Sequence, residues 1–189
     1  MTAPWPNLQK RKLLLLGCEG KSERAYAALL NRFAREAELA VQIRSLSLEH
    51  AGDPLGRVQL LLKKVGTEKK QFQWKGILLD SDQVHGKRAE SRAREARHLA
   101  KKHDINLIWQ NPCHEGLLLK HMPGQKNIQP ADCADAQRKL VAIWHKYQKP
   151  MNANQLSSRI SLEDIQRAAI VEPDLRKLLQ ATGLPLSAR

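Results

Sequence analysis

Four short apolar segments alternate with longer amphipathic segments along the chain. Residues 12–17 form a continuous apolar run that ends at a glycine, residues 41–48 alternate between apolar and polar, and further short runs follow at 74–79 and 105–110. Runs of this length and composition predict β-strands. The other segments predict helices, at residues 22–40, 54–65, 86–102, 112–122, 131–147, 162–171 and 173–182.

Several of these predicted helices carry signals at their ends. Pro54 and Pro112 suit the first turn of a helix, which would place Asn111 near an N-cap. Ser161 and Asp164 have the spacing of a capping box. The stretch at 148–158 is polar and predicts a loop.

Strands that alternate with helices predict an α/β fold in which helices flank a parallel four-stranded sheet. We expect the strand order 2-1-3-4, which makes the first and third strands neighbours. Ligands of such sheets bind at the carboxyl ends of the strands, near the point where the strand order reverses. We expect one domain at residues 1–148 and a C-terminal helical extension at 149–189 packed on it.

The composition adds a strong positive charge. The chain has 189 residues, with 32 Lys and Arg against 19 Asp and Glu, and its formal net charge is +13. This excess predicts attraction to polyanions, most often nucleic acid, although some basic proteins bind nothing anionic. No apolar run approaches the roughly 20 residues of a membrane span.

The N-terminus and the cysteines indicate the compartment. The first twelve residues lack the apolar segment of a signal peptide. Cys18, Cys113 and Cys133 are widely spaced and form no CxxC pair, which is not typical of a disulfide framework or a zinc site. We therefore expect a cytoplasmic protein with reduced thiols.

Carboxylates follow two of the predicted strands. Glu19 stands between two glycines after the first strand, and Asp80 and Asp82 follow the third. Their convergence would be costly without a compensating cation, and oxygen ligands suit Mg²⁺ or Mn²⁺. Gly20 leaves room beside Glu19 for a phosphodiester to approach. The alternative is that these acids are helix caps and loop charges, with Glu23 an acid favoured by the helix dipole.

Three stretches taken together resemble a known family. LLLLGCEGKSERAY at 13–26, ILLDSD at 77–82 and NPCHEGLLLKH at 111–121 are similar to the glutamate, Asp-x-Asp and Asn-Pro-Cys-x-Glu motifs of RloB-like proteins, which belong to the TOPRIM superfamily. The resemblance covers residues 12–148, and the stretch YQKPMN is a candidate continuation. It implies a TOPRIM-like fold that uses Mg²⁺ for phosphodiester chemistry.

The resemblance also implies roles for individual residues. Glu19 would be an acid/base or a metal ligand, Asp80 and Asp82 would be metal ligands, and Glu115 would complete the catalytic set. Further members of the motifs would contact metal or phosphate or support the site: Gly20, Lys21, Glu23, Asn111 and His114. On spacing alone, Asn111, His114 and Glu115 have an alternative interpretation as a helix start. RloB-like proteins resemble defence components found beside ATPases, which implies an ATPase partner.

A basic helix is predicted directly after the Asp-x-Asp motif. Its cations are candidates for contacts with a nucleic-acid backbone, above all Lys87, Arg88, Arg92 and Arg97. The alternative is a solvated helix face with ion pairs between successive turns.

Two functions follow from these observations. The first is Mg²⁺- or Mn²⁺-dependent cleavage of DNA or RNA, with tRNA among the candidate substrates, in antiphage defence with an ATPase partner. The second is a non-catalytic subunit that binds nucleic acid or a partner protein. Whether Glu19, Asp80 and Glu115 come within reach of one metal ion discriminates between the two.

Overall fold

The computed structural model describes residues 11–68 and 71–186. Most of the N-terminal segment used above to judge a signal peptide lies outside these ranges. None of the helices within them combines the length and the hydropathy that a membrane span requires.

The centre of the fold is a parallel four-stranded sheet. Its strands are β1 (Lys12–Cys18), β2 (Val41–Ser47), β3 (Trp74–Asp80) and β4 (Asn106–Gln110), in the order β2-β1-β3-β4. The predicted α/β fold and strand order are confirmed. Asp80 is the last residue of β3 and pairs with Gln110 of β4, so the Asp-x-Asp motif begins inside the sheet.

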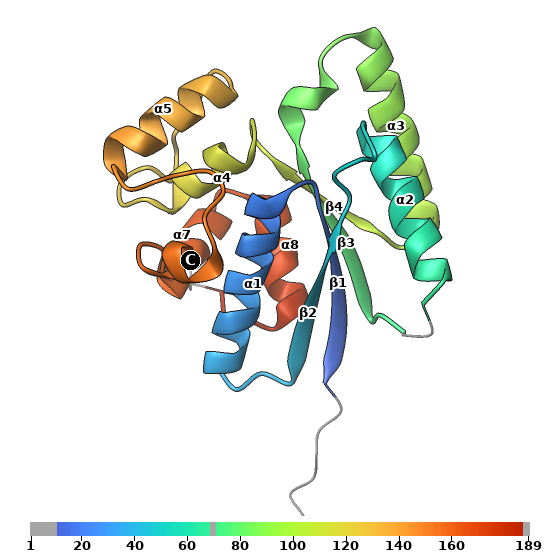
Figure 1. Cartoon of the computed structure of the whole chain (residues 1–189), viewed down its shortest axis with the longest axis horizontal. Coiled ribbons are helices and arrows are strands. Elements are labelled where there is room, and N and C mark those ends of the chain that lie inside the picture. The colour runs from blue at the N-terminus through green and yellow to red at the C-terminus, as the bar shows by residue number, and fades with distance from the viewer. Residues whose placement is uncertain (1–10, 69–70, 187–189) are drawn as a thin grey trace, which may run out of the picture.

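Helices cover both faces of the sheet, which explains the continuous apolar run in β1 (Figure 1). Leu14, Leu16 and Cys18 join one core cluster, and Leu15 joins the other. The first cluster lies under α1 (Lys21–Glu36), α4 (His114–His121), α7 (Leu162–Ala169) and α8 (Pro173–Thr182). The second lies under α2 (Pro54–Gly66) and α3 (Lys87–Lys102). The buried side chains of α3 are those of Ala93, Ala96 and Ala100.

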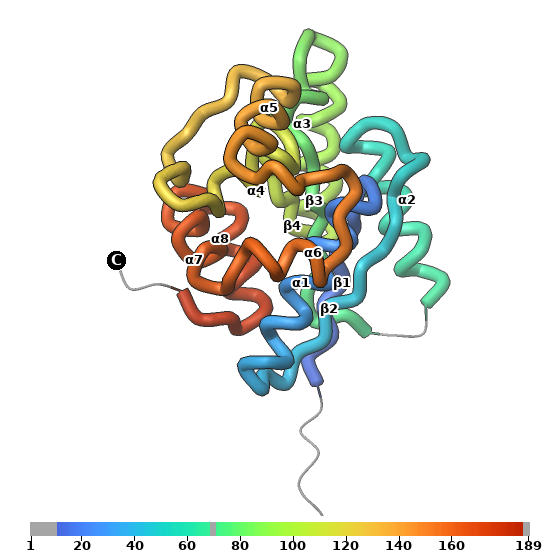
Figure 2. Tube along the Cα trace, turned by 60° about the vertical axis from the view of Figure 1, so that its left-hand side comes forward, coloured from blue at the N-terminus to red at the C-terminus, as the bar shows by residue number. Residues whose placement is uncertain are grey.

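The remaining elements lie around the ends of the strands. A short 3-10 helix, η1 (Ser81–Val84), leads from β3, and α5 (Cys133–Ile143) follows α4. The loop predicted at 148–158 is wrong in part, because it contains α6 (Ala153–Ser157). Asn152 caps this helix by accepting a hydrogen bond from the Gln155 backbone N at 3.0 Å. α6 packs beside α1 (Figure 2).

Several predicted helices are shorter than expected, among them α1 and α5. α1 ends at Glu36 rather than at residue 40, because Glu38 has a left-handed φ of 53° and the chain turns toward β2. α5 begins at Cys133 because Asp132 caps it, accepting from the Asp135 backbone N at 2.7 Å. The capping box predicted at Ser161 and Asp164 is present in α7.

The start of α4 also differs from the prediction. Pro112 does not open the helix and Asn111 is not its N-cap, because α4 begins at His114 with Cys113 as its N-cap. The Pro112 carbonyl accepts hydrogen bonds from the Asp82 backbone N at 3.0 Å and from Ser81 Oγ at 3.3 Å. These bonds tie the loop at Asn111 and Pro112 to η1 instead of to the helix.

Gly116 gives a test of this packing. A Cβ added there would lie 2.6 Å from the Asn111 carbonyl oxygen and 2.7 Å from Pro112 Cδ. Because backbone cannot move aside cheaply, we expect Gly116→Ala to lower the free energy of unfolding by about 1–3 kcal/mol in urea denaturation. Gly66→Ala is the matched control, since nothing lies within 4 Å of its added Cβ. Equal stability of the two variants would contradict the close packing of Gly116 on the loop.

Candidate functional site

The carboxylates that follow β1 and β3 meet in one cleft at the ends of these strands. The cleft has a volume of about 340 Å³ and contains both acids and cations. It is lined by Glu19, Gly20, Lys21, Ser22, Glu23, Glu49, Asp80, Lys149 and Pro150. The structure therefore brings Glu19 and Asp80 together, as the parallel order of β1 and β3 predicts.

Asp80 is the centre of negative charge in this cleft. Burial, and then repulsion from four other carboxylates, raise its pKa to about 8; the repelling groups are Glu19, Glu23, Asp82 and Glu115. Within the described residues, its Oδ1 atom is buried and has no hydrogen-bond partner. A buried acceptor without a donor is rare in proteins, and it is the kind of atom that a cation would satisfy.

Glu19 is held by three neighbours. Its Oε1 atom accepts from the Asp80 backbone N at 3.1 Å and forms an ion pair with Arg57 Nη1 at 3.1 Å. Its Oε2 atom accepts from Gln83 Nε2 at 2.8 Å. Burial raises the pKa of Glu19 above its ordinary value, although the Arg57 guanidinium opposes that shift.

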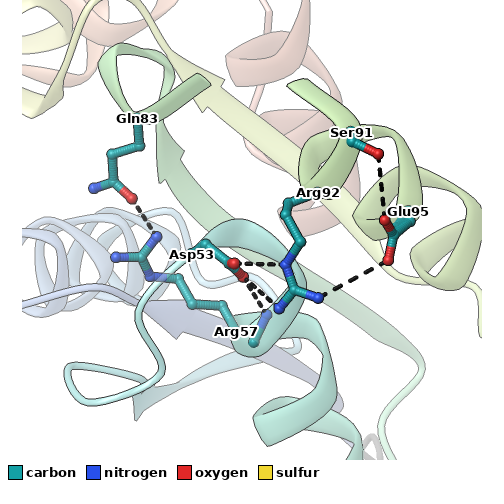
Figure 3. A network of polar contacts seen from close by, with 7 residues as sticks. Asp53, Arg57, Gln83, Ser91, Arg92 and Glu95 are labelled. Atoms are coloured by element: carbon teal, nitrogen blue, oxygen red, sulfur yellow. Dashed lines mark hydrogen bonds and ion pairs between the residues drawn. The ribbon is translucent and has the colours of Figure 1, made fainter. Parts of the chain in front are cut away.

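Arg57 and Gln83 are also bonded to each other. The Arg57 Nη1 atom donates to Gln83 Oε1 at 2.5 Å, so Arg57 reaches from α2 to η1 (Figure 3). Glu19, Arg57 and Gln83 thus each contact the other two, and they join the loop after β1 to α2 and η1.

Glu115 lies in the first turn of α4 and is buried. Its Oε1 atom accepts from Tyr147 Oη at 3.0 Å and pairs with Lys149 Nζ at 2.8 Å, and its Oε2 atom accepts from the Cys113 thiol at 3.4 Å. Burial favours the neutral acid, but the hydrogen bond and charge of Lys149 prevail and hold the pKa of Glu115 below its ordinary value. Glu115 is therefore ionised and already paired.

His114 lies beneath the site rather than in it. It is buried, its Nδ1 atom contacts Gln110 Nε2 at 2.9 Å, and its ring packs edge-on against Tyr26. Burial lowers the pKa of His114, which keeps the ring neutral. His114 therefore lies in the core and does not line the cleft.

The other predicted site residues have local roles in the structure. Glu23 is buried and its Oε2 atom accepts from the Gly20 backbone N at 2.9 Å, at the start of α1. Asp82 is exposed and accepts from the Cys133 thiol at 3.0 Å. Asn111 is exposed and its Oδ1 atom accepts from Ser81 Oγ at 3.2 Å.

The cations of α3 lie apart from the acidic cleft. Lys87 and Arg88 line a separate hollow of about 480 Å³. Arg92, which lines it too, pairs with Asp53 at 2.7 Å (Figure 3). The guanidinium of Arg97 lies over the Trp109 ring, 5.1 Å from its centroid. Two of these predicted nucleic-acid contacts are thus already engaged within the protein.

A divalent cation fits the chemistry of the acidic cleft. The available donors are carboxylate oxygens, which Mg²⁺ and Mn²⁺ prefer, and Asp80 Oδ1 is buried without a partner in the described chain. The carboxylates of the cleft do not, however, form a complete set of metal ligands in the part of the chain that the structure describes. Within residues 11–68 and 71–186, no three His, Cys, Asp or Glu side chains are placed to hold a metal ion.

Sequence reasoning missed Glu49, Ser22 and Pro150 of the cleft lining, as well as Lys149, which lines the cleft and pairs with Glu115. It also missed Arg57, Gln83 and Tyr147, which hold the carboxylates Glu19 and Glu115. Arg57 had a usable signal, because it shares the inner face of α2 with Pro54, Val58 and Leu61, and a charge on such a face requires a buried partner. Tyr147 and Lys149 stand in the YQKPMN stretch, where no local pattern shows that they reach Glu115.

Comparison with known proteins supports the resemblance of the motifs. Searches of curated proteins and of solved structures gave no match. A family model described as RloB-like protein matches residues 14–180, which include every carboxylate of the cleft and the helices that follow. The chain belongs to the RloB-like family.

Proposed function

We propose that this protein is a Mg²⁺- or Mn²⁺-dependent nuclease with a TOPRIM-like active site. The observation that carries the proposal is Asp80, a partly buried carboxylate that four other acids repel and whose buried Oδ1 atom has no hydrogen-bond partner in the described chain. A protein gains nothing in stability from such an arrangement unless a cation compensates it. The site stands at the carboxyl ends of the central strands, where ligands of parallel sheets bind.

Asp80 and Glu19 would hold the metal, with Asp82 and Glu23 near enough to repel Asp80 and to add negative charge. When bound, the ion would neutralise a phosphodiester and stabilise the attacking and leaving oxygens. The alternative role for Glu19 is that of proton acceptor instead of metal ligand, which the rise of its pKa on burial in the metal-free site favours.

Two cations in the same cleft would bind the phosphate. Lys21 and Lys149 line it together with Asp80, and both side chains are exposed. Lys149 is already paired with Glu115, which orients it. Glu115 would therefore act by positioning Lys149 as well as by adding to the field around Asp80.

A larger groove offers a path for the rest of the nucleic acid. It has a volume of about 550 Å³, shares Lys21 and Pro150 with the acidic cleft, and runs between α1 and the start of α6. Its charged lining residues are Lys21 and Arg24, with no acid. A polyanion leaving the cleft along this groove would meet only positive charge.

The second function remains a non-catalytic subunit that binds nucleic acid or a partner. One observation favours it, namely that the acids of the described chain are not arranged as a metal-ligand set. A role in antiphage defence beside an ATPase belongs to the first proposal and rests on the family alone. Co-purification of the chain with an ATPase encoded beside it would test that part.

Loss of the Asp80 carboxylate tests the nuclease proposal. We expect Asp80→Asn to reduce Mn²⁺-dependent cleavage of DNA, RNA or tRNA at least about 100-fold, since even indirect disturbance of a metal site costs 10–100-fold. It should also abolish the rise in melting temperature that Mn²⁺ produces by binding the native state. Without metal, the variant should be no less stable than the parent, because a source of repulsion is gone.

Asp104→Asn is the matched control. Asp104 is exposed at the end of α3 with a φ of 53°, a conformation that asparagine also adopts. The Asp104→Asn variant should cleave nucleic acid at the parent rate, and Mn²⁺ should raise its melting temperature as it does that of the parent. Cleavage by Asp80→Asn at the parent rate would contradict the proposal.

The path of the nucleic acid is tested by charge removal in the groove. Lys21→Gln with Arg24→Gln should weaken binding of a labelled oligonucleotide and reduce the slope of log K against log salt by about 2, one unit for each lost phosphate contact. Fluorescence anisotropy at several KCl concentrations measures both. Arg94→Gln with Lys102→Gln removes the same charge from exposed positions of α3 and should change the slope less. Equal effects of the two double variants would refute the groove as the path.

A further inference from the structure

Arg57 is a buried cation that contacts Glu19, one of the residues lining the acidic cleft. Its side chain is only 8% exposed, and among the described residues its Nε atom has no hydrogen-bond partner. Arginine carries a positive charge delocalised over its planar guanidinium group. Its contacts are the ion pair with Glu19 at 3.1 Å and the hydrogen bond to Gln83 at 2.5 Å.

These contacts use up most of the capacity of Glu19 to bind anything else. An ionised carboxylate offers about four lone-pair sites. In Glu19, the Asp80 backbone N, Arg57 Nη1 and Gln83 Nε2 occupy three of them. Asp80 Oδ1, in contrast, is unbonded within the described chain. Asp80, whose Oδ1 atom would attract a cation, thus lies next to Glu19, which is already paired with Arg57.

Lys149 holds Glu115 in a similar way but differs in its freedom. Its side chain is 51% exposed, so it can leave Glu115 for solvent or for a phosphate. Arg57 is enclosed by α2 and η1 and has no such route. Of these two paired cations, Arg57 is therefore the one that stays beside its carboxylate when a metal arrives.

Resting on the metal site proposed above, we propose that Arg57 is a built-in counter-cation that competes with the divalent ion for Glu19 and so sets the metal concentration at which the site fills. This explains why the acids gather around Asp80 and yet, within the described residues, form no ready ligand set. Arg57 is a positioning residue in this account, since it acts on the metal through Glu19.

Metal affinity should rise when the charge of Arg57 is removed. A divalent ion beside Asp80 is repelled by a guanidinium that touches the neighbouring Glu19, and charges close together in a partly buried site are screened less than they are in water. Without Arg57, the negative charge of Glu19 is no longer compensated, and its attraction for a divalent cation increases. Both effects favour the metal.

The experiment is a titration of the full, metal-free chain with Mn²⁺. Binding is measured by isothermal titration calorimetry and, independently, by the EPR signal of the Mn²⁺ that remains free. We expect Arg57→Gln to bind Mn²⁺ on the order of tenfold more tightly than the parent, because a positive charge that repels the ion has been removed. Arg57→Lys keeps the charge and should stay near the parent. Arg92→Gln is the matched control, because it removes one charge from the neighbouring ion pair with Asp53.

A second variant covers the case in which Arg57→Gln does not fold. Gln83→Ala removes one donor from Glu19 and the clamp on Arg57 while keeping every charge. It should tighten Mn²⁺ binding by a smaller factor than Arg57→Gln. Circular dichroism before the titration establishes which variants are folded.

Each result decides between the claims. If the parent binds Mn²⁺ and folded Arg57→Gln binds it equally or less tightly, the role of Arg57 is wrong and the metal site stands. If Arg57→Gln fails to fold, the same outcome for Gln83→Ala overturns it. Binding by Arg57→Gln where the parent binds nothing supports the inference. If neither the parent nor any folded variant binds Mn²⁺, both the inference and the proposed metal site fail.

Discussion

The arrangement of this protein depends on the burial of one carboxylate among others of the same charge. Asp80 ends β3, and its burial, followed by repulsion from four other acids, raises its pKa to about 8. The parallel sheet makes this unavoidable, because β1 and β3 are neighbours and their carboxyl ends lie at the same edge. The repulsion is a cost to folding that the α/β core must offset, and a bound cation would remove it.

The protein compensates the outer acids and leaves the central one uncompensated. Glu19 is paired with Arg57 and Glu115 with Lys149, whereas Asp80 Oδ1 has no partner in the described chain. Removing one partner of a buried ion pair commonly costs about 3–5 kcal/mol. The Glu19–Arg57 pair, which is largely buried on both sides, therefore holds Glu19 in place whether or not a metal is present. The attraction for a cation is concentrated on Asp80.

The sequence predicts the sheet well and the compensating cations poorly. Leu14 and Leu15 face opposite clusters, so a continuous apolar run does indicate a strand buried on both faces, and its end locates Glu19. Arg57 and Lys149 reach their partners from distant segments, 38 and 34 residues away along the chain (57 − 19 and 149 − 115). No local pattern encodes such a pairing. The start of α4 was missed for the same reason, because hydrogen bonds from η1 decide it.

The most direct test of the account is the position of a bound ion. Crystals of the full chain grown with Mn²⁺ would be measured near the manganese absorption edge. The account predicts an anomalous peak within bonding distance of the Asp80 carboxylate, in the cleft shared with Glu19 and Lys149. Well-ordered crystals at saturating Mn²⁺ with no peak there, or with the only peak at another surface, would contradict the claim that the acids at the strand ends form a metal site.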